Sequence, residues 1–402
     1  MKKLIVIGGG FAGLVLCNRL LDKNSEDFLL LEKSDKLGKK ILVTGNGRCN
    51  LTNEDISVCH YHGEHPEFAA YALEKYGQKA LEAFFFEKGL MLSYEEGRAY
   101  PLSKVANSVL DCLRARLDNG GGKDLIKLNS SVVGITRENG YYTVFLEDGG
   151  KYSAENVVVA SGGKSGQGLG TDGSAYELLR SLGHSVTELS PSLVQLKTSA
   201  FGKFLKGVKH KAAVSLFDSE RYICSFEGDF LFVDNGVSGN AVFNVSSRIA
   251  ETKKPYLKID FIPQCTKEEI VAALKNKVKT FGFLSATTLL TGYVHSSLSQ
   301  WIISVSGLKN KTLGELTGSD ISLAVARVKG YVAPIEGTFG FSCSQVTHGG
   351  VRTDEVNEKT FESKLKKGLF IVGEALDIDG DCGGYNLQWA FSSAMAAAEN
   401  FV

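Results

Sequence analysis

The strongest constraint on the fold is a glycine-rich turn near the N-terminus. Residues 4–7 form an apolar run that predicts a buried strand, residues 8–13 read Gly-Gly-Gly-Phe-Ala-Gly, and residues 14–21 have helical apolar spacing. Gly8 would allow the tight turn, Gly10 would let the backbone approach a pyrophosphate, and Gly13 would let helix and strand pack closely. The order predicts a βαβ unit whose helix N-terminus faces phosphates.

A second apolar run follows at residues 28–31 and ends on Glu32. Glu32 comes 19 residues after Gly13, close to the offset of about 20 residues at which an acidic side chain binds a ribose hydroxyl. Its carboxylate would repel a 2′-phosphate, so the pattern disfavours NADP at this turn. The pattern alone leaves FAD and NAD as alternatives.

Composition excludes several classes of protein. Lys plus Arg and Asp plus Glu both number 45 among 402 residues, so no overall positive charge favours nucleic acid or an anionic membrane. Eight scattered cysteines include no CxxC pair, which disfavours a zinc site and a short-spaced redox dithiol. No secretory leader or 18-residue apolar run is evident, and the chain is expected to be cytoplasmic, with reduced thiols and no membrane contact.

The pattern of the chain changes at Pro191. Before it, residues 33–53 read as a long polar loop, followed by helical patterns and then strands that end on the run 157–160. Short alternating segments follow to residue 261, and helical patterns cover residues 266–325. Strand and glycine-turn patterns return from residue 340, and the chain closes with a strand and helix at residues 368–401. We therefore expect a discontinuous first domain at residues 1–190 and 338–402, a β-rich insert at 191–262 and a helical insert at 263–337.

Several motifs carry a resemblance to a known family. They are Lys-Ile-Leu-Val-Thr-Gly-Asn-Gly-Arg-Cys-Asn-Leu-Thr-Asn at 40–53, Gly-Arg-Ala-Tyr-Pro-Leu-Ser at 97–103, Ala-Ser-Gly-Gly at 160–163, Val-Thr-His-Gly-Gly-Val at 346–351 and, most extensive, Gly-Glu-Ala-Leu-Asp-Ile-Asp-Gly-Asp-Cys-Gly-Gly-Tyr-Asn-Leu-Gln at 373–388. In this order they resemble the BaiN/YhiN-like flavoproteins. Shorter matches at 183–184, 191–194 and 360–364 extend the resemblance over nearly the whole chain.

The resemblance implies an α/β fold in which a Rossmann-like FAD-binding domain is interrupted by a β-barrel-like subdomain and a helical subdomain. It also implies that FAD, rather than NAD, binds at the first glycine turn. The fingerprint would hold the ADP half, the backbone near Val133 would meet the adenine, and later motifs would follow the chain of the cofactor to the flavin. The expected contacts are Gly8, Gly10, Phe11, Ala12, Gly13, Glu32, Lys33, Lys40, Thr44, Gly45, Gly47, Arg48, Cys49, Asn50, Val133, Ser161, Gly162, Gly373, Glu374, Gly384, Asn386 and Leu387.

A few of these residues suggest chemistry. Arg48 is a natural charge partner for phosphate or reduced flavin. Gly384 and Asn386 stand at the expected start of the last helix, whose N–H groups would stabilise negative charge at the flavin N1 and O2 edge. Cys49 is expected to be a packing residue rather than a reactive thiol, and His348 a loop residue rather than a proton donor. The sequence identifies no catalytic acid or base.

The function implied is that of an FAD-dependent oxidoreductase, which passes a hydride between flavin N5 and a small carbonyl, enone, amine or amino ketone. The substrate is expected in an apolar cleft between the FAD domain and the insert. NAD(P)H, docking transiently, and oxygen are the alternatives for the electron partner. A flavoprotein that modifies RNA and a flavin-binding sensor or assembly protein are the competing classes. Zero net charge weighs against RNA, no nucleic-acid partner is expected, and the oligomeric state is not predicted.

Overall fold

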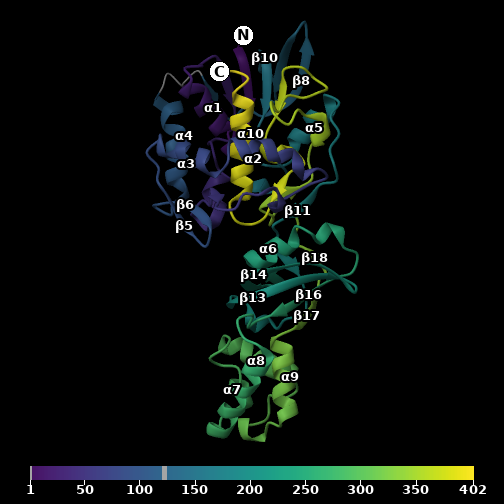
Figure 1. Cartoon of the computed structure of the whole chain (residues 1–402). Helices are drawn as coiled ribbons and strands as arrows, with labels where there is room; N and C mark the ends of the chain where they lie inside the picture. The colour runs from purple at the N-terminus through teal and green to yellow at the C-terminus, as the bar shows by residue number, and fades with distance from the viewer. Residues whose placement is uncertain (1, 120–124) are drawn as a thin grey trace. The chain divides into compact units, whose positions relative to one another are not determined.

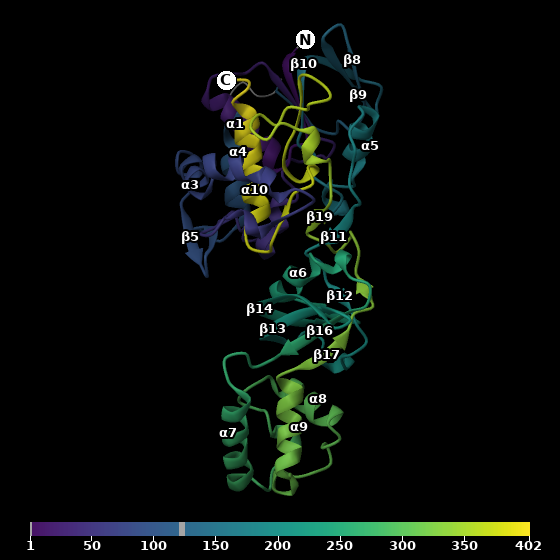
Figure 2. The same ribbon diagram turned by 45° about the vertical axis from the view of Figure 1, so that its right-hand side comes forward.

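The computed structural model describes residues 2–119 and 125–402, and the chain divides into two compact units (Figures 1 and 2). Unit 1 is Met1–Pro191 with Ser344–Val402, and unit 2 is Ser192–Cys343. Unit 2 is therefore inserted into unit 1.

A seven-stranded mixed sheet forms the centre of unit 1. Its strands follow the order β7-β2-β1-β10-β9-β8, and β20 also pairs with β10. The pairs β1–β2, β1–β10, β10–β20 and β2–β7 are parallel, whereas β8, β9 and the first part of β10 are antiparallel. The strands are β1 Lys2–Ile7, β2 Phe28–Leu31, β7 Ile126–Lys127, β8 Val132–Glu138, β9 Tyr141–Leu146, β10 Lys151–Val159 and β20 Leu369–Ile371.

Helices and three small sheets complete unit 1. The helices are α1 Phe11–Asp22, α2 Ala70–Lys75, α3 Gln78–Phe86, α4 Ala106–Asn119, α5 Ser174–Ser181 and α10 Tyr385–Ala398. The small sheets pair β3 Thr52–Asn53 with β6 Arg98–Pro101 and β5 Leu92–Glu95, β4 Tyr61–His62 with β21 Asp379–Gly380, and β11 Ser190–Ser192 with β19 Val346–His348.

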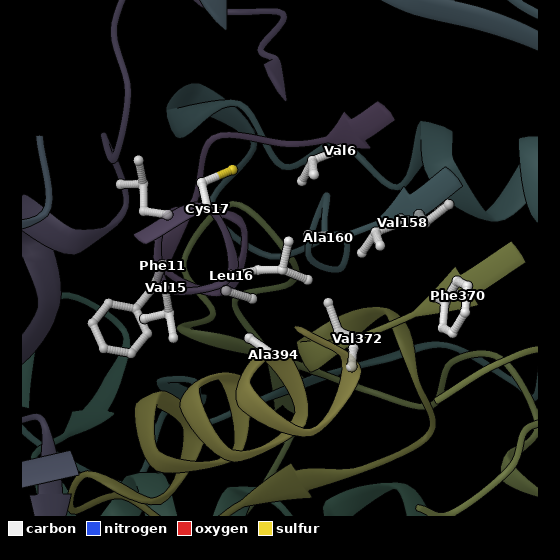
Figure 3. Close-up of a cluster of buried hydrophobic side chains, with 14 of the residues drawn as sticks. Val6, Phe11, Val15, Leu16, Cys17, Val158, Ala160, Phe370, Val372 and Ala394 are labelled. Carbon is white, nitrogen blue, oxygen red and sulfur yellow. The ribbon is translucent and has the colours of Figure 1, made fainter. Parts of the chain in front are cut away.

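The core of unit 1 lies where the parallel strands meet α1 and α10. Figure 3 shows Val6 of β1, Val158 of β10, Leu16 of α1 and Ala394 of α10 directed into one apolar cluster, and all four are fully buried. Strands covered on both faces read as continuous apolar runs, which explains the unbroken apolar segments of β1 and β2. The same burial places the strand ends, and the loops that follow them, in fixed positions.

Unit 2 contains an antiparallel sheet of seven strands and four helices. The strand order is β17-β16-β13-β14-β15-β12-β18. The strands are β12 Leu196–Lys197, β13 Lys209–Asp218, β14 Arg221–Val233, β15 Gly236–Ser238, β16 Pro255–Asp260, β17 Tyr331–Pro334 and β18 Gly337–Thr338, and the helices are α6 Asn240–Ser246, α7 Lys267–Thr280, α8 Ser296–Val305 and α9 Gly318–Val328.

The expected fold class is confirmed, and the differences are local. The loop expected at residues 33–53 contains the 3-10 segment η1 Ile41–Gly47 and the short strand β3. Strand β17 lies within the range expected to be helical, but it pairs with β16 in the antiparallel sheet. Short edge strands of this kind depend on a distant partner, so local sequence predicts them poorly.

Candidate cofactor and active site

Four segments of unit 1 follow directly after parallel strands. The glycine turn follows β1, Glu32 follows β2, Ser161 and Gly162 follow β10, and Gly373 follows β20. The carboxyl ends of parallel strands meet at one edge of a sheet, where α/β proteins bind their ligands. Candidate residues from four distant parts of the sequence therefore gather at a single edge.

The first glycine turn requires glycine at two positions for steric reasons. Gly8 has a φ of +107°, and a Cβ there would lie 2.6 Å from the carbonyl oxygen of Ala160. A Cβ on Gly13 would lie 2.0 Å from the carbonyl oxygen of Gly8. These contacts let α1 begin against the strands, as the glycine spacing predicts.

Gly10 differs from these two glycines. A Cβ there would meet no protein atom within 4 Å among the described residues, so the backbone borders open space. Gly10 is also the N-cap of α1, without a side-chain cap, and the first N–H groups of a helix have no partner within it. Phe11 and Ala12 are buried, so they would contribute their backbone N–H groups. The N-terminus of α1, with its unpaired N–H groups and the open space beside Gly10, is therefore suited to binding a phosphate.

Glu32 fixes the shape of the glycine turn. Its Oε2 accepts a hydrogen bond from the N–H of Gly9 over 2.7 Å, and its Oε1 accepts from the N–H of Ser34 over 2.7 Å. Each carboxylate oxygen keeps a further lone pair for a ribose hydroxyl. Glu32 therefore also acts as a brace between two loops, a role that the sequence analysis did not anticipate. The next residue, Lys33, pairs instead with Asp172 over 2.8 Å.

A second group of candidates surrounds Glu374. Its Oε2 accepts from Nζ of Lys40 over 2.7 Å, and its Oε1 accepts from the N–H of Thr347 over 3.0 Å. A Cβ on Gly162 would approach Oε2 of Glu374 within 3.8 Å. Lys40 therefore neutralises this carboxylate and joins the loop after β2 to the segment after β20.

Gly373 connects this group to the first helix. It has a φ of +67°, and a Cβ there would lie 3.4 Å from Cβ of Ala12. Its N–H donates to Oγ of Ser393, and its carbonyl accepts from Nε1 of Trp389, both in α10. The turn after β20 is thus held between α1 and α10.

The loop at residues 44–50 is shaped by left-handed backbone. Gly45, Asn46, Gly47 and Cys49 all have positive φ. Oγ1 of Thr44 donates to the carbonyl of Ile41, and the carbonyl of Thr44 accepts from the N–H of Cys49. Burial raises the pKa of the Cys49 thiol to about 12, so this cysteine is a packing residue, as its pattern predicts.

Arg48 is held by two protein side chains. Its guanidinium pairs with Oε2 of Glu95 over 3.2 Å and lies 4.5 Å from the centre of the Tyr100 ring. This contact anchors the loop to the hairpin β5–β6. The structure gives Arg48 a structural role here, and its expected cofactor contact stays a prediction.

The loop ends against the start of α10. Gly384, the N-cap of α10, has a φ of +100°, and a Cβ there would meet the carbonyl oxygen of Thr52 at 2.4 Å and Oδ1 of Asn50 at 2.8 Å. Nδ2 of Asn53 donates to the carbonyl of Gly383 over 2.9 Å. The expected helix start is confirmed, and strand β3 holds it beside the loop.

The side-chain amide of Asn386 bonds to the protein backbone. Its Oδ1 accepts from the N–H of Gly380 over 2.9 Å, and its Nδ2 donates to the carbonyl of Gly380 over 2.7 Å. It therefore closes the turn that precedes α10, and the neighbouring Leu387 is half-buried. Val133 lies at an irregularity of the β8–β9 ladder, where pairing passes from Val132 to Gly134, and a bulge leaves the extra residue unpaired.

These residues suit a dinucleotide on two structural grounds. Gly10 opens onto space at a helix start, as described above. In addition, Oγ of Ser161 and Oδ1 of Asn50 are buried side-chain oxygens with no hydrogen-bond partner among the described residues. Buried polar atoms are rarely left unpaired, and both belong to the predicted contact set. The strand edge therefore fits a polar ligand of the FAD type.

An Asp–His pair lies close to the start of α10. Nδ1 of His348 contacts Oδ1 of Asp379 over 2.7 Å, and Asp379 is fully buried. Asp377, two residues earlier, accepts from the N–H of Glu64, and its pKa is raised because it is buried. Asp379 therefore fixes the orientation of the His348 ring through its Nδ1 atom.

A second histidine cluster was not recognised from sequence. Asp381 accepts from Nδ1 of His60 over 3.0 Å and from Nε2 of His62 over 2.8 Å, and the His60 ring stacks on Tyr385 with centres 4.5 Å apart. Burial lowers the pKa of His60, but its hydrogen bonds to Asp381 and Asp55 outweigh this, so the net shift is upward. The alternating aspartates at 377, 379 and 381 were the available signal.

In the part of the chain that the structure describes, no three His, Cys, Asp or Glu side chains group as a metal site. Within residues 2–119 and 125–402, no helix is long and apolar enough to cross a membrane.

Comparisons with known proteins give a consistent family. A profile of the HI0933-like protein Rossmann domain matches residues 2–400. A 3-dehydro-bile acid delta(4,6)-reductase of Clostridium scindens is 35% identical over 99% of this chain and 98% of its own. A ribosomal RNA dihydrouridine synthase of Haemophilus influenzae is 30% identical over 98% of this chain and 97% of its own.

Among solved structures, a flavocytochrome c3 fumarate reductase in its open conformation is similar over 100% of this chain and 78% of its own. The identity is 15% and the TM-score is 0.47. The family assignment therefore rests on the sequence comparisons.

Proposed function

The chain belongs to the HI0933-like Rossmann-domain family, in agreement with the resemblance found in its sequence motifs. We propose that it is an FAD-dependent oxidoreductase. We further propose that it reduces a carbon–carbon double bond conjugated to a carbonyl group in a small organic substrate. The observation that carries the first part is the gathering of Gly10, Glu32, Ser161 and Gly373 at the carboxyl ends of four parallel strands.

The reaction class rests on what two relatives are named for. Reduction of a 3-oxo compound at its delta(4,6) double bonds and conversion of uridine to dihydrouridine are chemically alike, since each saturates a double bond conjugated with a carbonyl. Such a reduction adds a hydride to one carbon and a proton to the other. We propose NAD(P)H as the source of the electrons.

In this proposal the predicted contacts hold FAD, which supplies hydride transfer at its N5 atom. The N–H groups at the start of α1 bind the pyrophosphate, and Glu32 binds the adenosine ribose while it braces Gly9. The start of α10 at Gly384 stabilises negative charge. Lys40, paired with Glu374, keeps this edge of the site from accumulating unpaired negative charge.

We propose His348 as the proton donor. Its Nδ1 is held by the buried carboxylate of Asp379, which orients the ring. A proton on Nε2 would then be delivered to the substrate carbon next to the carbonyl group. The sequence pattern favours a loop residue without a chemical role at His348. We propose the proton-donor role because its partner Asp379 is fully buried.

A uridine in RNA is a second candidate substrate, and the 30% identical relative favours it. The same double-bond chemistry would apply, with the uracil ring in place of a small enone. Anaerobic reduction by NADH or NADPH, followed by addition of an enone in one sample and uridine-containing RNA in another, separates the two. Reoxidation by neither, with rapid reoxidation by air, would contradict both candidates.

A further inference from the structure

Charge is distributed unevenly between the two units. Residues 192–343 contain 18 Lys and Arg but 12 Asp and Glu. Since both totals for the chain are 45, the rest contains 27 basic and 33 acidic residues. Unit 2 therefore has a formal charge of +6 and the remainder −6, which the overall neutrality of the chain conceals.

The end of α7 carries two exposed aromatic rings. Phe281 and Phe283 directly follow this helix, and their exposed fractions are 44% and 79%. Two exposed rings two residues apart form a local apolar feature that a binding partner can cover. In Figures 1 and 2, α7 lies beside α9 within unit 2.

The segment that carries these rings is held firmly. Nζ of Lys277 donates to the carbonyls of Thr288, Leu289 and Thr291, which closes the loop after the helix. The N–H of Gly314 donates to the carbonyl of Gly282, between the two phenylalanines, over 2.9 Å. A fixed segment presents its rings without a large ordering cost on binding.

Exposed lysines accompany the rings. Lys275 and Lys279 are one helical turn apart in α7 and both are exposed. Lys279, in the last turn of α7, also interacts favourably with the helix dipole, but that effect does not account for the two exposed phenylalanines. Aromatic rings beside lysines form the usual surface for single-stranded nucleic acid, where bases stack on the rings and phosphates pair with the lysines.

We propose that this segment, Lys275, Lys279, Phe281 and Phe283, is a contact surface for single-stranded RNA. The excess positive charge of unit 2 favours an anionic partner, and the two lysines beside the rings in the sequence suit the phosphates of RNA. The inference rests on the second candidate of the proposed function, since it supplies the surface by which an RNA substrate would be held.

The test measures binding of a fluorescein-labelled RNA of mixed sequence, about 20 nucleotides long, which exceeds a single-stranded site of roughly 4–16 nucleotides. Fluorescence anisotropy is recorded with the full-length, FAD-loaded protein at several salt concentrations. We expect Phe283→Ala to weaken binding about 10-fold. We expect Lys275→Ala with Lys279→Ala to reduce the slope of log affinity against log salt by about 1.4, at roughly 0.7 for each phosphate contact.

Matched controls separate this surface from general effects. Phe86→Ala removes a phenylalanine of unit 1 that is 69% exposed, and Lys23→Ala with Lys151→Ala removes two exposed lysines of unit 1. Neither control should change binding. Circular dichroism and bound FAD should be unchanged in every variant.

Two results would overturn the proposal. One is that the wild-type protein does not bind the RNA, or that Phe283→Ala, Phe86→Ala and the wild type bind it with equal affinity. The other is a change in oligomeric state caused by Phe283→Ala, which would assign the rings to a second copy of the chain. Enone reduction is measured on the same samples, so that failure of RNA binding is distinguished from failure of the proposed chemistry.

Discussion

The N–H of Gly9 donates a hydrogen bond to Oε2 of Glu32 over 2.7 Å, across 23 residues of sequence. The acidic residue at the end of the second strand thereby holds the glycine turn at the end of the first. A carboxylate that would bind a ribose thus also fixes the loop that would bind the adjoining phosphates.

Replacing the Glu32 carboxylate should lower the affinity for FAD more than it lowers the stability of the fold. Glu32→Gln leaves one acceptor oxygen and sets an NH₂ group against a backbone donor. Hydrogen bonds to charged groups contribute about 1.5–3 kcal/mol, so FAD affinity should fall roughly 10- to 100-fold. Fluorescence titration of the apoprotein with FAD measures this change. Glu26→Gln, at an exposed position, is the control, and equal affinities for the two variants would contradict the role of Glu32.

Gly10 and Gly13 should respond differently to alanine. A Cβ on Gly13 would lie 2.0 Å from the carbonyl oxygen of Gly8, so Gly13→Ala should destabilise the apoprotein by about 1–3 kcal/mol. Gly10→Ala meets no protein atom and should change stability by less than about 0.5 kcal/mol, while weakening FAD binding at least tenfold. Urea unfolding of both apoproteins, with FAD titration, compares them. Strong FAD binding by Gly10→Ala would argue against a cofactor at this turn.

Proton donation by His348 and reduction of the flavin by NAD(P)H can be tested separately. His348→Gln should lower kcat for alkene reduction by about 10²- to 10⁴-fold but leave the rate of flavin bleaching by NAD(P)H unchanged. Asp379→Asn should also lower kcat, because the His348 ring loses the carboxylate that holds its Nδ1 atom. His65→Gln alters an exposed histidine and serves as the control. A loss of bleaching in His348→Gln equal to its loss of turnover would contradict the assignment.

The histidine cluster near α10 should make stability depend on pH. Hydrogen bonds to Asp381 and Asp55, partly opposed by burial, raise the pKa of His60 above its ordinary value of 6.5. The folded state therefore binds this proton more tightly than the unfolded state. The resulting stability is fully present below pH 6.5 and is lost as pH rises through the folded pKa. Melting temperatures of wild type and His60→Gln should converge at high pH, and a constant difference would contradict this linkage.

The sequence predicts the parts of the fold that depend on local patterns. The apolar strand, glycine turn and helix at residues 4–21 were predicted because periodicity and steric demand act within one short segment. The start of α10 was predicted because two glycines precede an apolar helix. The clusters around Asp379 and Asp381 were not predicted, since Asp381 joins His60 across 321 residues.

The short strands were not predicted from sequence for the same reason, because their pairing partners are distant in the sequence. The pairing of Thr52 with Ala99 and of Asp379 with His62 joins strands of only two to four residues. Such strands exist because of their partners and not because of their own composition. The uneven charge of unit 2 was also hidden, because a net charge for the whole chain averages over both units.

The most direct test of the account is an anaerobic spectrum of the purified protein. We predict bound FAD, identified by mass spectrometry after release, that NADH or NADPH bleaches. Addition of an enone such as cyclohex-2-enone, before any air is admitted, should restore the oxidised spectrum and yield the saturated ketone. Protein that neither contains nor accepts FAD would contradict the central claim.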